Sequence, residues 1–153
     1  PAGVLGLGAM VHTTKREIAA DDFFTGMFET ALEADEIIVK VAFPKPEAAG
    51  YAKFPNPASR YATVGVFIAK TAGGVRVAVT GAGACAFRLP EFEAALAKTF
   101  TAEAIADLRV PAKGLNDDLH ASAEYRAHLV TVMAKRAVRM ATRPHSASAP
   151  IGL

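Results

Sequence analysis

The stretch Asp21–Arg60, which reads DDFFTGMFETALEADEIIVKVAFPKPEAAGYAKFPNPASR, decides how the chain is divided. It contains a β-branched run, Ile37–Phe43, that two closely spaced prolines end. Because β-branched residues favour strands and proline cannot continue a hydrogen-bonded ladder, this pattern predicts a buried strand followed by a break. We therefore expect a boundary between two domains in the segment PKPEAAG, with residues 45–50 as the linker.

After this boundary the pattern changes to short strands with tight turns. Strands are predicted at Tyr51–Phe54, Val64–Lys70 and Val75–Val79, and the last of these alternates valine with other residues. Gly73 and Gly74 can supply the positive φ angles of a tight turn between the second and third strands. The three strands predict an antiparallel meander with one buried and one polar face.

The rest of the chain reads as helical. Pro90–Thr99 begins with a proline and two acids, as a helix start should. A shorter helix is predicted from Thr101, and a long one over Ser122–Met140, where apolar residues form one stripe. The whole is an α+β domain over residues 51–142, a three-stranded antiparallel sheet packed on a three-helix bundle, with a tail at 143–153.

Upstream of the boundary, Val4–Thr14 and Lys15–Ala19 predict a β-hairpin that turns near Thr13–Arg16. The nearby glycines Gly3, Gly6 and Gly8 give G-x-x-G-x-G, which is the wrong order for a dinucleotide-binding fingerprint. We read them instead as sites where a strand or helix packs closely against a neighbour.

The stretch Asp21–Arg60 resembles part of the FAD-binding medium subunit of molybdenum hydroxylases, the carbon monoxide dehydrogenase and xanthine dehydrogenase family. The resemblance covers most of the chain. Its residues are the acid and aromatic pair Asp22–Phe24, the turn Thr30–Leu32, the strand Asp35–Pro44, the segment Lys53 with Ala58–Arg60, Val64–Val66 and Asn116–Val138. By this resemblance, residues 1–44 are the terminal strands of a flavin-binding domain, and residues 51–142 form the C-terminal domain of the flavoprotein subunit.

The resemblance implies electron relay as the function. In this family a large subunit with a molybdenum cofactor oxidises the substrate, a small subunit carries two [2Fe-2S] clusters, and the FAD of the medium subunit passes electrons to an acceptor. The family's glycine-rich pyrophosphate loops lie upstream of the equivalent of Pro1. FAD would therefore be shared with an upstream FAD-binding segment, and this chain would hold no substrate-oxidising site. The sequence names neither the substrate nor the acceptor.

Two cofactor-binding residues follow from the resemblance alone. Ile38 matches an aliphatic position against the isoalloxazine ring, where it would exclude water. Lys53 matches a lysine near the flavin or its acceptor side, where a cation would favour the reduced ring. Taken without the resemblance, Ile38 is ordinary core and Lys53 is a solvated surface charge.

Composition narrows the remaining classes of protein. A hydrophobic content of 52% with 21% charged residues indicates a globular chain, and a net charge of +2 is too small to argue for nucleic acid. The basic residues Lys135, Arg136, Arg139 and Arg143 fall at a helix end, where cations offset the dipole. The single cysteine, Cys85, excludes an internal disulfide or cysteine cluster and reads as a buried thiol. No apolar run reaches the roughly 18 residues of a membrane helix, so we expect a cytoplasmic protein.

Three residues near the last helix are given structural roles. Asp117 and Asp118 precede this helix and are expected to favour its N-terminus instead of acting as a catalytic pair. Arg126 is expected to pair with an acid or with a partner chain.

An alternative function is a stand-alone, flavin-free interaction module related to the C-terminal domain. Against it, the apolar strands Val4–Val11 and Ile37–Phe43 would lack partners, and exposed strand edges of this kind invite association. We therefore favour a chain that completes a larger flavoprotein.

Overall fold

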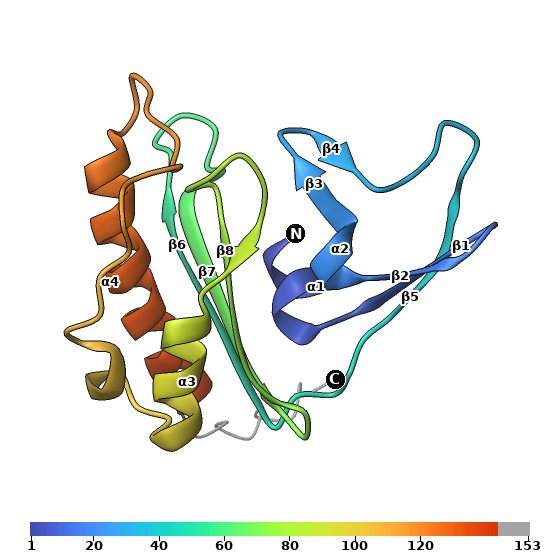
Figure 1. Cartoon of the computed structure of the whole chain (residues 1–153). Coiled ribbons are helices and arrows are strands. Elements are labelled where there is room, and N and C mark those ends of the chain that lie inside the picture. Colours follow the sequence, from blue (N-terminus) through green and yellow to red (C-terminus); the bar gives the residue numbers. More distant parts are fainter. Residues whose placement is uncertain (144–153) are drawn as a thin grey trace, which may run out of the picture.

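The computed structural model describes residues 1–143 and forms layers around one antiparallel sheet (Figure 1). The N-terminal region contains the elements α1 (Ala2–Leu7), β1 (Met10–Thr13), β2 (Glu17–Ala19), α2 (Ala20–Phe23), β3 (Phe24–Gly26), β4 (Glu29–Thr30) and β5 (Ile38–Ala42). The C-terminal region contains the elements β6 (Ala48–Pro55), β7 (Ala62–Thr71), β8 (Gly74–Thr80), β9 (Phe87–Arg88), α3 (Pro90–Lys98), the 3₁₀ turn η1 (Glu103–Ile105) and α4 (Ala123–Ala141). Within residues 1–143, no helix is long and apolar enough to cross a membrane. The predicted tail at 143–153 lies outside the description except for its first residue.

The central sheet has four antiparallel strands in the order β6-β7-β8-β9. The predicted meander and its turn are confirmed, because Thr71 pairs with Gly74, whose φ is 115°. The prediction of three strands was incomplete, since β9 is too short for an alternating pattern to reveal it. Strand β6 also begins at Ala48, three residues before the predicted start.

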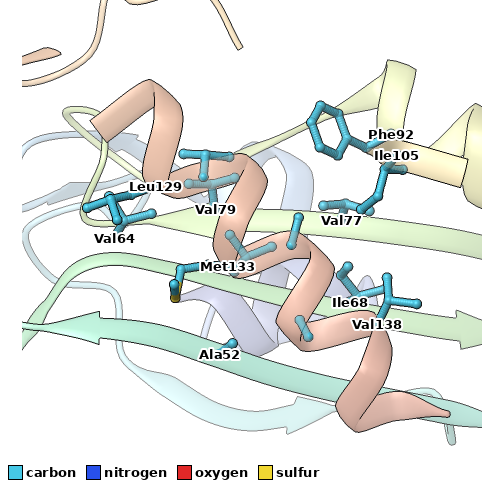
Figure 2. Packing of buried hydrophobic residues seen from close by; sticks show 14 of the residues in the cluster. Ala52, Val64, Ile68, Val77, Val79, Phe92, Ile105, Leu129, Met133 and Val138 are labelled. Carbon is cyan, nitrogen blue, oxygen red and sulfur yellow. The ribbon is translucent and has the colours of Figure 1, made fainter. Parts of the chain in front are cut away.

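The main core lies between this sheet and the helices α3 and α4 (Figure 2). Ser122 caps α4, since its hydroxyl accepts a hydrogen bond from the backbone N–H of Tyr125 at 3.2 Å. The buried stripe of α4 includes Val130, Met133 and Ala137, and it packs on β6 and β7. Burial of these side chains is the largest favourable contribution to folding here.

The predicted three-helix bundle was wrong in its arrangement. The segment after Thr101 forms only the turn η1, and α3 and α4 each pack on the sheet (Figure 1). Glycine at position 50 permits this close seating, because a Cβ there would overlap the carbonyl oxygen of Ala137. The helices therefore form a layer on the sheet.

The second face of the central sheet was predicted to be polar, and this was wrong. Helix α1 covers it by packing on β7 and β8, and Ala69 and Ala78 are fully buried. A Cβ at Gly6 would lie 2.5 Å from the ring of Phe67, so the expected close packing at this glycine is confirmed. The segment from Val4 was predicted as a strand but is helical, and it ends at Gly8 with φ 64°.

The N-terminal region contains a second, smaller sheet in the order β2-β1-β5. The predicted hairpin is confirmed, with the N–H of Thr13 donating to the carbonyl of Arg16 at 2.8 Å. Strand β5 pairs with the other side of β1 and lies at the edge of the sheet. The predicted burial of this strand was wrong, since Ile38 and Val39 remain 41% and 63% exposed.

An ion network joins the two regions. Arg76 donates to Asp21 at 2.7 Å and twice to the carbonyl of Leu5, and Arg88 bridges Asp21 and Glu93. Burial alone would raise the pKa of Asp21, but the hydrogen bonds and charges of Arg76 and Arg88 lower it. This network fixes the N-terminal region against β8, β9 and α3.

Candidate functional site

A cleft of about 720 Å³ lies between the β3–β4 hairpin and one end of the central sheet. This volume is within the range of roughly 300–1,000 Å³ that is typical of small-molecule sites. Its lining is mainly apolar and aromatic and includes Phe28, Tyr51 and Tyr61. The cleft is therefore suited to a flat, largely apolar ligand.

Tyr51 forms part of the cleft wall because its diagonal neighbour on β7, Gly65, has no side chain. A Cβ at Gly65, on β7, would lie only 2.5 Å from the hydroxyl oxygen of Tyr51. The missing side chain lets the Tyr51 ring lie along the sheet, where burial raises the pKa of its hydroxyl. The strand therefore offers an aromatic surface to the cleft.

Two strained residues stand beside this cleft. Phe28 and Arg60, with φ of 59° and 63°, are the two non-glycine residues with positive φ among residues 1–143. Phe28 lines the cleft with a fully exposed side chain, and Arg60 precedes the lining residue Tyr61. Left-handed backbone at non-glycine residues costs energy and clusters at ligand sites, which supports a functional role for this cleft.

The loop that carries Arg60 is tightly built around Asn56. The Oδ1 atom of Asn56 accepts from the backbone N–H groups of Ala58 at 3.0 Å and Ser59 at 3.3 Å. The backbone N–H of Asn56 donates to the carbonyl of Tyr61 at 2.8 Å. These bonds hold Tyr61 at the cleft with little freedom to rearrange.

Lys53 binds to the same loop. It lies on β6 with an exposed side chain, and its Nζ donates to the carbonyl oxygen of Arg60 at 2.8 Å. It shares a face of β6 with Tyr51, two residues earlier, but it does not line the cleft. The structure therefore places this predicted site residue beside the cleft.

The floor of the cleft is held by side chains from distant segments. The carbonyl of Gly81 accepts from Asn116 Nδ2 at 3.3 Å and from Arg126 Nη1 at 3.1 Å. The buried guanidinium of Arg126 also donates to Thr63 and to both carboxylate oxygens of Asp118. The expected ion pair of Arg126 with an acid is thus confirmed.

Asp118 binds groups of the loop that precedes α4 and the side chain of Arg126. The backbone N–H of His120 and the guanidinium of Arg126 lower the pKa of Asp118 despite opposing desolvation. Asp118 therefore anchors the loop before α4 and does not bind the helix start, whereas Asp117 accepts from the N–H of Ala123, the first residue of α4, at 3.4 Å, as expected.

Ile38 lies outside the cleft. It opens β5, is partly exposed and faces Thr13 of β1. The structure thus does not bring Ile38 and Lys53 together around this cavity, and the assignment of both as flavin contacts stays a prediction.

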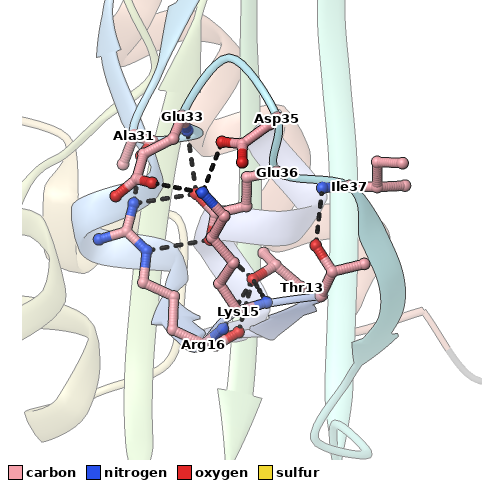
Figure 3. A network of polar contacts seen from close by, with 9 residues as sticks. Thr13, Lys15, Arg16, Ala31, Glu33, Asp35, Glu36 and Ile37 are labelled. Carbon is pink, nitrogen blue, oxygen red and sulfur yellow. Dashed lines mark hydrogen bonds and ion pairs between the residues drawn. The ribbon is translucent and has the colours of Figure 1, made fainter.

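A buried carboxylate fixes the turn that leads to Ile38 (Figure 3). The side chain of Glu36 is fully buried and accepts from Arg16 at 3.0 Å, from Thr13 at 2.7 Å and from the N–H of Glu33 at 2.9 Å. The Arg16 hydrogen bond is the largest of the causes that lower the pKa of Glu36 to about 2. Lys15 closes the outside of this turn by binding Glu33 and Asp35.

Several residues of the cleft could not be found from sequence. Phe28, Tyr51 and Asn116 were not singled out as site residues, although each lies in a segment that carries the resemblance. Cys85 was expected to be buried, but it is half-buried and lines the cleft. In the described part of the chain, no group of three or more His, Cys, Asp or Glu could hold a metal ion.

The two relatives described here are named as the medium subunit or medium chain of an enzyme. No family model matches the chain. The chain is 33% identical over 152 residues to the nicotine 6-hydroxylase medium subunit of Paenarthrobacter nicotinovorans, covering 90% of this chain and 54% of the relative. It is 30% identical over 139 residues to the carbon monoxide dehydrogenase medium chain of Hydrogenophaga pseudoflava, covering 83% of this chain and 48% of that relative.

A solved structure supports the same relationship. A chain of CO dehydrogenase from Oligotropha carboxidovorans superimposes with a TM-score of 0.75 at 25% identity, covering 92% of this chain and 55% of that chain. The α+β architecture of this chain is therefore shared with that CO dehydrogenase chain. The chain belongs to the family of molybdenum hydroxylase medium subunits, and it spans about half the length of the relatives that it matches.

Proposed function

We propose that this chain forms one wall of the FAD site in the electron-transfer subunit of a molybdenum hydroxylase. The observation that carries the proposal is its 33% identity to a medium subunit across 90% of the chain. In this role electrons pass from iron-sulfur clusters through FAD to an external acceptor. The molybdenum cofactor and the [2Fe-2S] clusters belong to the large and small partner subunits.

The cleft fits the ring system of a flavin. Tyr51, Tyr61 and Phe28 offer apolar and aromatic surface, and the carbonyl groups around Gly81 and Gly83 are already engaged by Asn116. FAD supplies one- and two-electron transfer when bound. The residues of this chain would hold the ring, exclude water from it and fix the two walls of the cleft relative to each other.

Lys53 is suited to orient an anionic group beside the ring. A lysine ammonium has three donors, and one of them is used by the Arg60 carbonyl in this structure. The other two remain for a ligand or an acceptor. Ile38 lies away from the cleft, so a contact between Ile38 and flavin would be made on the β5 side of the molecule.

Native mass spectrometry of the purified protein tests the proposal. We expect this chain in a complex with large and small subunits, together with the mass of FAD. A lone species of 16.0 kDa without flavin would contradict the proposal and favour the interaction module.

The role of Lys53 is tested in the purified complex with Lys53→Ala. We expect slower reoxidation of the flavin by its acceptor at unchanged flavin content. Lys70→Ala is the matched control, because Lys70 is also exposed on the central sheet and pairs only with Glu47 within the described residues. Unchanged reoxidation in the Lys53 variant would remove Lys53 from the site.

A further inference from the structure

The side-chain amide of Asn116 has one orientation that its neighbours allow. Its Nδ2 atom donates to the carbonyl oxygen of Gly81 at 3.3 Å and to that of Gly83 at 3.0 Å. Backbone carbonyls can only accept, so an amide oxygen turned toward them would meet groups of the same partial charge. The nitrogen of the amide therefore faces these carbonyls, and both of its hydrogens are used.

The oxygen of the same amide, Oδ1, is left without a donor. No group among residues 1–143 donates to it, although every buried polar side-chain atom in this part of the chain has a hydrogen-bond partner. Oδ1 is therefore not buried, and the side chain that carries it lines the cleft between the β3–β4 hairpin and the central sheet. The wall of the cleft consequently offers a hydrogen-bond acceptor to a ligand.

The loop that carries this acceptor is held in place from two sides. The backbone N–H of Asn116 donates to the carbonyl of Ala82 at 2.8 Å, and the preceding residue Leu115 forms an antiparallel bridge with Gly83. The guanidinium of Arg126, which is 2% exposed, donates at 3.1 Å to one of the two carbonyls that Asn116 binds. The acceptor is thus fixed before a ligand arrives, which lowers the entropy cost of binding.

An acceptor in a mainly apolar cleft selects a ligand with a matching donor. A ligand that covered Oδ1 with a carbonyl group or an apolar edge would remove water from it and supply no hydrogen bond, which is unfavourable. The chemical class that fits is a flat ring with an N–H in its edge, as in an imide. The oxidised isoalloxazine ring of a flavin has a single ring N–H, at N3, between carbonyl groups.

We propose that Oδ1 of Asn116 accepts a hydrogen bond from the N3–H of the flavin and thereby selects the orientation of the ring in the cleft. This inference rests on the proposed function, and it adds a specificity-determining residue from a loop that no motif marks. The imide edge of the ring then faces the wall at Gly81 and Gly83, where Asn116 is anchored.

The affinities of FAD and of FAD methylated at N3 test this contact. Both flavins are titrated into the purified native assembly after its own flavin has been removed, and binding is followed by flavin fluorescence. The methyl group removes the donor, so we expect the wild-type assembly to bind methylated FAD about ten-fold or more weakly. Asn116→Ala removes the acceptor and should bring the ratio of the two affinities close to one.

The ratio separates a ligand contact from a structural role. Loosening of the Gly81 turn in Asn116→Ala would weaken both flavins alike and leave their ratio at the wild-type value. Asp117→Ala is the matched control, because Asp117 is the next residue, is exposed and does not line the cleft. It should keep the wild-type ratio. Asn116→Ser, whose hydroxyl can still donate to one carbonyl, replaces Asn116→Ala if the latter does not assemble.

The outcomes also distinguish this contact from the flavin proposal. Equal affinities in the wild-type assembly overturn the role of Asn116 without any variant, and so does a preference that survives the loss of its amide. If FAD binds but N3 methylation has no effect, the proposed function stands and this inference falls. If FAD does not bind the assembly at all, both are contradicted.

Discussion

The N-terminal and C-terminal regions of the molecule are stabilised by different kinds of interaction. Residues 48–141 form one continuous apolar core, in which the inward side chains of the sheet meet α3 and α4. Residues 2–42 have only two small buried clusters, and one of these is completed by Ala78 of the central sheet. The N-terminal region is stabilised in addition by polar contacts, those of Glu36 inside it and those of Asp21 at its boundary with the sheet.

This difference indicates which region depends on its surroundings. Apolar burial stabilises the C-terminal region by its own area, at about 25 cal/mol per Å². Partly exposed ion pairs contribute far less, so the N-terminal region is expected to open more readily. The face that opens is also the one that carries the uncovered strand β5 and the hairpin of the cleft.

The largest expected effect is loss of a core aromatic in the C-terminal region. Phe92 is 1% exposed, and Phe92→Ala should lower the free energy of unfolding by about 3–5 kcal/mol because it leaves a cavity. Urea unfolding measures this cost. The matched change Phe23→Ala removes a ring that stacks edge-on with Phe24 in the N-terminal region. It should cost less because its buried cluster is smaller, and an equal cost would contradict this difference between the two regions.

The next effect concerns the contact between helix and sheet. Gly50→Ala should destabilise the protein by about 1–3 kcal/mol or more, since the new Cβ would overlap the carbonyl of Ala137 and displace α4. Gly73→Ala is the control, because its nearest neighbour is Thr71 Oγ1 at 3.6 Å. Thermal unfolding of both variants tests the expectation, and equal midpoints would show that α4 is not seated on β6 at Gly50.

A pH effect on the N-terminal region is expected from Glu36. The pKa of Glu36, about 2 in the folded chain, lies below its ordinary value near 4.5, so an unfolded chain binds this proton more readily. The stabilisation is fully present above about pH 4.5 and is lost as the pH falls through about 2. The protection factors of the β1 and β2 amides should therefore fall over this range in the wild type. Glu36→Gln should remove the dependence, and a variant that keeps it would assign the titration to another group.

The C-terminal region was also the more predictable of the two. Strands β7 and β8 and helix α4 were visible because each contributes regularly spaced apolar side chains to the main core, and this spacing is recorded in the sequence. The N-terminal helix α1 was taken for a strand, since its small apolar residues and glycines carry no clear period. Its contact with Phe67 depends on a chain segment about sixty residues away, which no local pattern records.

The cleft was hidden for a similar reason. Its lining comes from the β3–β4 hairpin, the strand β6, the turn at Gly81 and the loop at Asn116, so no spacing within one segment marks it. The resemblance to a family pointed to Lys53, which lies beside the cleft, but gave no indication of Phe28 or Tyr51. The strained backbone of Phe28 becomes visible only once the chain is folded.

The smallest expected effect has the opposite sign and tests how firmly α1 is docked. Gly3 lies in α1, and no atom lies within 4 Å of the position that a Cβ would take there, so Gly3→Ala should stabilise the protein by about 0.5–1 kcal/mol through reduced backbone entropy. Gly6→Ala makes the same change one turn later, where the new Cβ would meet the ring of Phe67 at 2.5 Å. Any gain in helix propensity is then offset by displacement of α1 from the sheet. If calorimetry finds both variants stabilised, α1 does not rest on the sheet in solution, and the N-terminal region is less ordered than its ion pairs suggest.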